Sequence, residues 1–429
     1  MPGAPGHPGP LLAWWQKRHT LTVLCAASVV ISYSDRVNMS VTILDMAEEN
    51  SWDERTKGVV LSSFFFGYIV TQLAGGFLAL RLGGGRTLNA AVFVWSLFTL
   101  LTPPAAKTSV GALFVCRVAM GMGEGMGFPC IYTILGACVP EAERARSMGI
   151  IQAGVPLGQV AAFFSVPLIS ARVGWELVFV FFASLGFLWN LLWLGLGVDD
   201  RDVGVNLRQD KEKGGDAEGG PAAEAASKPP LGFFLSNVAV LAVTAAHMCH
   251  NWGWWLLMSW LPTFMHAKFG LEKSSLSIIF LPYFVMFLSF PAVGVLADAA
   301  YRRGWPKLRM CKLFTAVGMI GPAFGYLLLN SMPTQRAAIA LMYFVFLAGT
   351  AMGSGALINH LDIAPAHAGI LMGISNTAAC VPGIIGVPLT DFLLQDNAGD
   401  WGAVFNLASL VTAAGCVVFL VYARAEPIL

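Results

Sequence analysis

The sequence predicts an all-α membrane protein whose twelve transmembrane helices form two pseudo-symmetric halves of six. Three observations predict this fold: the scarcity of charge, the number of long apolar segments, and a pattern repeated on either side of a charged central segment. Of the 429 residues, 56% are hydrophobic and 12% are charged, whereas a soluble globular protein has about 25% charged residues. So few charges cannot cover water-exposed domains, and much of the surface must therefore face lipid.

Twelve segments satisfy the requirements of a membrane span. A helix needs about 20 mainly apolar residues to cross a bilayer, because hydrocarbon offers no partners for free backbone amides. In chain order, the predicted spans are residues 20–43, 58–80, 88–106, 111–138, 148–170, 177–197, 235–265, 274–296, 310–329, 338–357, 368–393 and 403–421. Glycine stands at every second position from 121 to 127, a spacing that predicts close helix packing.

Basic residues are divided unequally between the two sets of loops. With the N-terminus in the cytosol, the cytosolic side carries 17: Lys17, Arg18, Arg81, Arg86, Arg144, Arg146, Arg201, Arg208, Lys211, Lys213, Lys228, Arg302, Arg303, Lys307, Arg309, Lys312 and Arg424. The other side carries 7: Arg55, Lys57, Lys107, Arg172, Lys268, Lys273 and Arg336. Because cytoplasmic loops hold the excess of Lys and Arg, both termini are predicted to be cytosolic. The pattern leaves open a plastid membrane, another endomembrane or the plasma membrane.

A charged segment without helical periodicity, residues 198–230, predicts a flexible cytosolic linker between two halves. Local sequence at 76–81 and 148–150 recurs at 294–298 and 372–374, as an internal duplication would produce. The predicted organisation is a cytosolic tail at 1–19, a six-helix half at 20–197, the linker, a second six-helix half at 231–423 and a cytosolic tail at 424–429.

Four ionisable residues lie inside predicted spans, where each costs about 2.5 to 3.5 kcal/mol on an insertion scale. They are Asp35, Arg36, Arg117 and Glu124. Arg36 lies beyond the middle of its span by roughly 7 to 8 Å at 1.5 Å per residue, and Arg117, on an antiparallel span, reaches a similar depth. His250 comes to a comparable level from the other half. Two guanidinium groups and an imidazole predict a pocket for an anion such as phosphate or a carboxylate.

The two buried carboxyl groups have different predicted roles. Glu124 follows Arg117 by two helical turns and therefore shares its face. A carboxylate beside an anion site can couple transport by taking up H⁺ or lying near Na⁺, or it can simply neutralise an arginine as a structural pair. Asp35 precedes Arg36 directly, and adjacent side chains on a helix diverge. Asp35 is therefore predicted to be structural.

Composition and motifs argue against several other functions. The net charge of +1 gives no reason to expect a nucleic acid partner. The eight cysteines lack metal-ligand spacing and no HExxH motif occurs, so no cofactor is expected beyond Na⁺ or H⁺ as a coupling ion. His247, His360 and His367 are expected to be packing or interfacial residues. Without a nucleophile–base pairing or a nucleotide motif, the chain is not expected to be an enzyme; its expected partners are a small anionic solute and the lipid bilayer, and it is expected to be monomeric.

Six ordered motifs resemble those of the anion:cation symporter family of the major facilitator superfamily. This family includes vesicular glutamate transporters, sialin, vesicular nucleotide transporters, Na⁺/phosphate cotransporters and plant-type phosphate transporter 4 anion transporters. The resemblance extends from about residue 32 to residue 426 and is nearest to the plant-type group. The motifs are residues 35–40 (DRVNMS), 62–68 (SSFFFGY), Arg117 with Gly121 and 124–125 (EG), 250–252 (HNW), 359–365 (NHLDIAP) and 369–377 (GILMGISNT).

The resemblance implies that Arg36 and Arg117 contact the substrate anion and that Glu124 takes part in cation coupling. Members of the plant-type group move inorganic phosphate, often with Na⁺, and one branch moves ascorbate. Two positions depart from the vesicular glutamate transporters: Leu61 stands where they have His, and His250 where they have Arg.

The resemblance also implies gating contacts in the cytosolic loops. The predicted gating residues are Arg81, Arg86, Asp298 and Arg302. Leu80 replaces the Asp usual in the first gating loop of major facilitators, whereas Asp298 keeps it in the second half. The sequence therefore predicts an asymmetric gate.

Two functions from different classes fit the predicted site. The first is a secondary active transporter of phosphate or a small organic anion, coupled to Na⁺, H⁺ or membrane potential and working by alternating access. The second is a passive anion channel or uniporter that uses the same arginines for selectivity. Selectivity is expected to depend on neutral donors: Tyr68, Asn251, Ser375 and Asn376.

Overall fold

The computed structural model describes residues 17–196, 231–270, 277–396 and 399–428, and these residues are helical, without a strand among them. The predicted linker and most of the predicted N-terminal tail lie outside the described residues. The N-terminal half contains α1 (Lys17–Asn50), α2 (Glu54–Leu82), α3 (Gly84–Thr108), α4 (Val110–Gly125), α5 (Gly127–Cys138), α6 (Glu141–Val173) and α7 (Trp175–Gly195).

The C-terminal half begins with a short helix that the sequence did not predict. Asn237 separates this helix from the next one, because its side chain accepts hydrogen bonds from the backbone of Ala239 and Val240 as a helix N-cap does. The elements of this half are α10 (Leu231–Ser236), α11 (Val238–Phe269), α12 (Ser277–Arg302), α13 (Lys307–Leu329), α14 (Gln335–Gly349), η2 (Thr350–Ser354), α15 (Ala356–Ile363), η3 (Pro365–His367), α16 (Ala368–Asp396) and α17 (Gly402–Tyr422).

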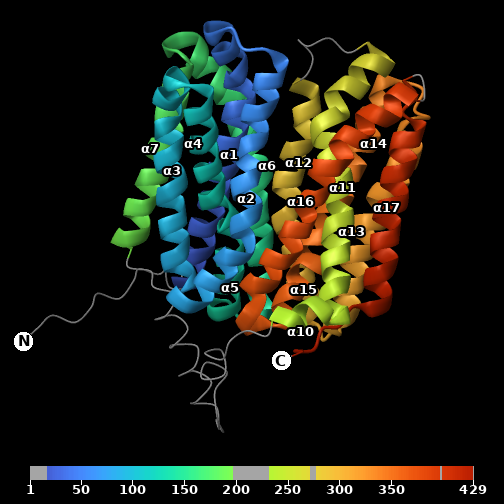
Figure 1. Cartoon of the computed structure of the whole chain (residues 1–429). Helices are drawn as coiled ribbons and strands as arrows, with labels where there is room; N and C mark the ends of the chain where they lie inside the picture. The colour runs from blue at the N-terminus through green and yellow to red at the C-terminus, as the bar shows by residue number, and fades with distance from the viewer. Residues whose placement is uncertain (1–16, 197–230, 271–276, 397–398, 429) are drawn as a thin grey trace, which may run out of the picture.

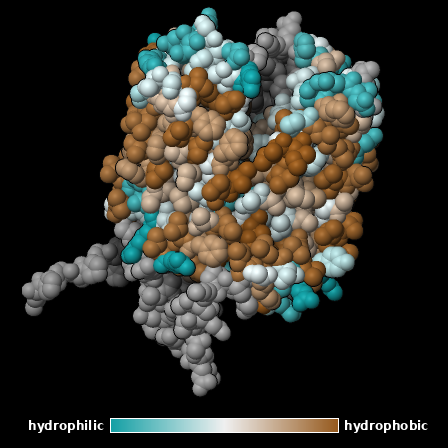
Figure 2. Space-filling model, viewed as in Figure 1, coloured by the Kyte–Doolittle hydropathy of each residue, from teal (hydrophilic) through white to brown (hydrophobic). Residues whose placement is uncertain are grey.

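The helices of the described residues account for twelve membrane crossings. Within the described residues, ten helical segments are long and apolar enough to cross a bilayer, with α14, η2 and α15 taken together. The 32-residue α11 and the pair α4–α5 make up the remaining two. Figure 2 shows apolar side chains over the middle of the visible face and polar ones gathered toward both ends, as expected for a protein surrounded by lipid.

Two of the predicted spans are interrupted, and they occupy equivalent positions in the two halves. The fourth span breaks at Met126 between α4 and α5, and the tenth contains the 3₁₀ turn η2. Glycines flank both breaks, and glycine is about 1 kcal/mol less favourable than alanine inside a helix. Prediction of continuous helices across these two points was therefore wrong, although the crossings themselves are present.

The chain termini define one end of the molecule, here called the terminal end. Figure 1 shows the start of α1, the end of α17, α10, the lower part of α5 and α15 at this end. The halves are joined there: the Tyr132 hydroxyl donates to the Leu357 carbonyl at 3.1 Å, and Arg144 donates to the Leu361 carbonyl at 3.4 Å. At the opposite end the surface is hollowed between the halves (Figure 2).

Glycine allows the halves to approach at two related helix crossings, α2 with α16 and α12 with α6. A Cβ atom at Gly76 would lie 2.7 Å from the Gly369 carbonyl oxygen, and one at Gly294 would lie 2.5 Å from the Ala145 carbonyl oxygen. Both distances are too short for a real side chain. Gly76 and Gly294 are equivalent positions of the sequence repeat, so the duplicated residues make the same type of contact in the two halves.

Candidate functional site

A cavity lies between the two halves. It encloses about 870 Å³ of space between atoms, part of it open to solvent. Its wall is mainly aromatic and aliphatic, with polar side chains from α1, α6, α11, α13 and α16: Tyr33, Gln152, His247, His250, Asn251, Tyr326 and Asn376. An apolar cavity with a few polar groups is the usual form of a small-molecule site.

A smaller cavity of about 260 Å³ lies beside the first, inside the N-terminal half. Tyr33 and Phe128 line both cavities and therefore form the partition between them. The smaller cavity contains Arg36 and Glu124, two of the residues that the sequence singles out.

Arg36 and Glu124 form a buried ion pair. The Arg36 Nε atom lies 2.8 Å from Glu124 Oε2, and the Ser32 hydroxyl donates to the same oxygen at 2.7 Å. The other carboxylate oxygen, Oε1, is buried and has no hydrogen-bond partner within the described residues. Charge-assisted contacts of this kind are strong in a site shielded from water. The pair keeps a guanidinium and a carboxylate together in the smaller cavity.

Aromatic rings hold the Arg36 guanidinium in place. Its Cζ atom lies 4.4 Å from the centre of the Tyr33 ring, 4.5 Å from that of Tyr68 and 5.1 Å from that of Phe64. The Tyr68 hydroxyl in turn accepts a hydrogen bond of 3.2 Å from Asn376 Nδ2 on α16. Arg36 is thus linked through Tyr68 to the opposite half, across the plane where the halves meet.

Arg117 occupies a different position from the one expected. It lies neither in the larger cavity nor in the smaller one. It is buried with its Cζ atom 5.3 Å from the Phe64 ring centre, and its Nη1 atom lies 3.1 Å from the Met120 sulfur. Phe64 therefore has both guanidinium groups against its ring. The expectation of one pocket holding Arg36, Arg117 and His250 is corrected: Arg117 lies against Phe64 and Met120, whereas His250 lines the larger cavity.

On the C-terminal side, His250 and Asn251 line the larger cavity as expected, whereas Ser375 does not. The Ser375 Oγ atom lies behind the wall, 3.1 Å from His247 Nδ1 and 2.7 Å from His360 Nε2. His247 itself lines the cavity, although it was expected to be a packing or interfacial residue. Its position three residues before His250 on α11 places both imidazoles on one helix face, which is the signal that could have revealed it.

The predicted gating residues lie at the terminal end. Asp298 Oδ1 accepts from the Ala145 backbone N–H at 3.2 Å and Oδ2 from that of Arg146 at 3.1 Å, so a carboxylate of α12 is hydrogen-bonded to the backbone near the start of α6. Arg81, Arg86 and Arg302 are exposed at the same end.

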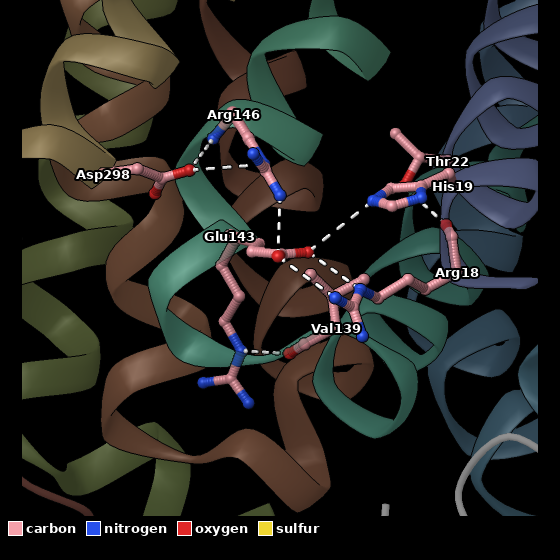
Figure 3. Close-up of polar contacts among 8 residues, drawn as sticks. Arg18, His19, Thr22, Val139, Glu143, Arg146 and Asp298 are labelled. Carbon is pink, nitrogen blue, oxygen red and sulfur yellow. Dashed lines mark hydrogen bonds and ion pairs between the residues drawn. The ribbon is translucent and has the colours of Figure 1, made fainter. Parts of the chain in front are cut away.

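Figure 3 shows that this contact continues into a larger charged network. Arg146 pairs with Glu143 at 2.7 Å, and Glu143 pairs with Arg18 at 2.8 Å. The network therefore joins α1, α6 and α12. Arg146 and Glu143 were missed by sequence reasoning because nothing in the local sequence shows that α12 meets the beginning of α6.

No group of three or more His, Cys, Asp or Glu side chains among the described residues is arranged to hold a metal ion. The arrangement is instead that of a transport protein: two helical halves, closed together at one end, with a cavity containing a cationic side chain near their interface.

Comparison with known proteins identifies the class further. Residues 24–387 match the family model described as Major Facilitator Superfamily. The xylose–proton symporter XylE superposes with a TM-score of 0.75 at 14% identity, with 96% of this chain and 97% of that chain covered.

Comparison with named relatives identifies the family within this superfamily. The Arabidopsis thaliana "Sodium-dependent phosphate transport protein 1, chloroplastic" is 36% identical over 98% of this chain and 82% of the relative. The Arabidopsis "Ascorbate transporter, chloroplastic" is 36% identical over 97% and 77%, and human sialin is 31% identical over 99% and 93%. The chain therefore belongs to the major facilitator superfamily and, within it, to the anion:cation symporter family.

Proposed function

We propose that this protein is a secondary active transporter of inorganic phosphate or a small organic anion, coupled to Na⁺, H⁺ or membrane potential, that works by alternating access. The observation that carries the proposal is the Arg36 guanidinium, held by Tyr33 and Tyr68 beside the interface of the halves and paired with a single carboxylate, Glu124. A guanidinium presents a planar fork of donors that matches phosphate and carboxylate.

Glu124 and a substrate anion compete for the Arg36 guanidinium. This competition couples anion binding to cation binding. An anion that binds Arg36 displaces the Glu124 carboxylate, whose charge is then left buried. Leaving an unpaired charge in a low-dielectric site is costly, so displacement is favoured when a cation or a proton neutralises the carboxylate. Cation and anion binding thereby assist each other, as linkage requires.

The other predicted site residues are proposed to assist this step from positions around the Arg36–Glu124 pair. Tyr68, His250, Asn251 and Asn376 provide neutral donors near the interface, and Ser375 fixes the orientation of His247 from behind the wall. Arg117 acts without direct contact: its charge beside Phe64 raises the positive potential in the smaller cavity.

Alternating access is supported by the asymmetry of the described conformation. The terminal end is closed by the two glycine crossings and the Asp298 contact, whereas the opposite end is hollowed between the halves. In the proposed cycle the terminal end opens as the opposite end closes, and the exposed arginines Arg81, Arg86 and Arg302 lie at the moving edge. Both termini are proposed to be cytosolic, from the excess of basic residues on their side. The names of the plant relatives favour a plastid membrane.

Reconstitution tests the proposal. Purified protein is reconstituted into liposomes that contain a low concentration of phosphate, ascorbate or glutamate. Uptake of the same labelled anion is then measured under separate Na⁺, H⁺ and voltage gradients. A transporter concentrates at least one of these anions above its outside concentration when an ion gradient is imposed. If every anion only equilibrates to its own electrochemical gradient, the protein is a channel or uniporter and the proposal is wrong.

A further inference from the structure

A chain of three hydrogen-bonded side chains leads from the larger cavity into the C-terminal half. Its members are His247 on α11, Ser375 on α16 and His360 on α15. His247 lines the cavity, whereas Ser375 and His360 are at most 1% exposed. In the proposed function this chain only fixes the orientation of His247. Its hydrogen bonds also decide which nitrogen of His247 carries a proton.

The inner end of the chain fixes the state of His360. Its Nδ1 atom lies 2.8 Å from the Leu357 carbonyl oxygen, which can only accept, so Nδ1 carries a proton. Among the described residues, no Asp or Glu oxygen lies within 4.0 Å of the His360 ring nitrogens. A second proton would leave a buried positive charge unpaired, which is costly. His360 is therefore neutral, and its Nε2 atom is an acceptor.

This polarity passes through Ser375 to His247. The Ser375 Oγ atom lies 2.7 Å from His360 Nε2 but 3.3 Å from the Met372 carbonyl oxygen, so its proton lies on the shorter bond. The His247 Nδ1 atom is 3.1 Å from the same Oγ atom, whose remaining lone pairs can only accept. Nδ1 of His247 must therefore carry its proton. In a neutral imidazole the other nitrogen, Nε2, then has a bare lone pair.

The bare Nε2 atom of His247 belongs to a residue of the cavity wall. Like His360, His247 has no Asp or Glu oxygen within 4.0 Å among the described residues, so nothing there stabilises a second proton on its ring. The amides of Asn251 and Asn376 on the same wall can offer a ligand either a donor or an acceptor. His247, with its proton held at Nδ1, offers an acceptor and cannot donate.

We propose that His247 is a specificity-determining residue whose Nε2 atom selects anions that carry an O–H group, so that phosphate binds and sulfate is rejected. This inference rests on the proposed function, and it names the class of anion that the site accepts. Phosphate remains partly protonated at neutral pH and can donate to Nε2, whereas sulfate has a similar shape but presents only lone pairs. A site that is built to pair with an O–H group rejects the analogue that lacks it, because its own polar atom is left without a partner.

Calorimetric titration of three anions into the purified full-length protein tests the inference. Phosphate, sulfate and monofluorophosphate are compared in mildly alkaline buffer, where all three are mainly dianions of similar size and only phosphate carries an O–H group. The wild type is expected to bind phosphate about tenfold more tightly than either of the other anions, or with a still larger preference. His247→Phe, which keeps a planar ring without a nitrogen, is expected to bring the ratio of affinities close to one.

Ser375→Ala distinguishes selection by Nε2 from a merely structural role of His247. This variant keeps both imidazoles but breaks the chain, so the His247 proton is no longer held at Nδ1 and the preference for phosphate should fall several-fold. It also decides the matter if His247→Phe does not fold. Ser289→Ala is the matched control, because Ser289 is also buried and donates to carbonyl groups of its own helix, at 2.8 Å to Val285. The control should keep the wild-type preference.

Three results would overturn the inference and leave the proposed anion transport intact. The first is a wild type that binds sulfate or monofluorophosphate as tightly as phosphate. The second is an undiminished preference for phosphate in His247→Phe or in Ser375→Ala, and the third is loss of the preference in Ser289→Ala. If none of the three anions binds to the wild type, the inference is wrong and phosphate is also excluded as the transported anion.

Discussion

At the scale of residues, the main feature of the proposed anion site is the Arg36 guanidinium, which is paired with the Glu124 carboxylate. Arg36 has three aromatic rings around it and one carboxylate in front of it. The rings fix its position without competing for its donors, because they interact with the face of the guanidinium. In the proposed cycle, Glu124 is the group that an anion displaces from Arg36. Lysine could not replace Arg36 in the proposed anion site, because its ammonium group has neither the fork of N–H donors nor the planar face of a guanidinium.

Substitution of Arg36 tests this specificity. Arg36→Ala is expected to abolish uptake of the transported anion, and Arg36→Lys to reduce it at least tenfold, because an ammonium keeps the charge but loses the bidentate fork. Uptake into liposomes is measured with Arg336→Ala as the control, since Arg336 is exposed at the start of α14. Wild-type uptake by Arg36→Lys would show that charge alone is needed.

Arg117 is expected to behave differently from Arg36 because it lines neither cavity. Arg117→Ala removes a charge that acts through the Phe64 ring, so the concentration of anion needed for half-maximal uptake should rise. Arg117→Lys, which keeps the charge, should restore most of the affinity. Concentration dependence of uptake in the two variants checks this expectation. Equal loss in both would mean that Arg117 contacts the anion directly in another conformation.

Glu124 carries the coupling in this account. Glu124→Gln cannot hold a charge, so anion exchange should persist while its dependence on the driving ion is lost. Exchange and gradient-driven uptake are compared in the same liposomes. If uptake by Glu124→Gln depends on the driving ion as in the wild type, Glu124 has only a structural role, in which its Oε2 atom binds Ser32 and Arg36.

At the scale of elements, the contacts between the halves depend on helices that approach at glycine. Gly76 on α2 lies against the backbone of α16 at Gly369, and Gly294 on α12 lies against that of α6 at Ala145. No side chain fits at either point while the terminal end is closed. These crossings belong to the closed conformation, so blocking one of them should favour the conformation in which the terminal end is open.

Gly76→Leu is therefore expected to trap the protein open at the terminal end and to reduce transport at least tenfold. Accessibility is measured by impermeant maleimide labelling from the terminal side of a single cysteine at Gln152, which lines the larger cavity. Gly58→Leu is the control, because nothing lies within 4 Å of a Cβ atom there. A Gly76→Leu protein that transports normally and stays unlabelled from the terminal side would contradict the role of this crossing.

At the scale of the whole molecule, composition and segment length were sufficient to predict the architecture. Twelve crossings and the equivalence of Gly76 with Gly294 follow from hydrophobicity and repetition, which are properties of the chain itself. The breaks at Met126 and at η2 were missed, since both lie within apolar, glycine-containing runs that could also continue as helix.

The site was predictable in part, for a physical reason. Depth along a helix follows from residue number at 1.5 Å per residue, and it correctly brought Arg36 and Arg117 to one level, where both contact Phe64. The rotation of each helix about its axis, and the positions of the side chains between helices, depend instead on packing. The sequence therefore could not show that Phe64 packs against both arginines, that His247 faces the cavity, or that Asp298 binds the backbone of α6.

The Asp298 contact predicts a property of the whole cycle. Its carboxylate accepts two backbone hydrogen bonds from α6 across the halves, so Asp298→Asn should weaken closure of the terminal end, and the cysteine at position 152 should become labelled from that side. Asp391→Asn is a suitable control, since Asp391 is exposed and contacts only Gln395 of its own helix among the hydrogen bonds of the described residues. Equal labelling of both variants would exclude Asp298 as a gating contact.

The most direct test of the account is calorimetric titration of inorganic phosphate into purified wild type, Arg36→Ala and Glu124→Gln. If an anion and Glu124 compete for Arg36, removal of the carboxylate should tighten phosphate binding about tenfold, or about 1.4 kcal/mol, and Arg36→Ala should not bind. Equal phosphate affinity in all three proteins would contradict the account.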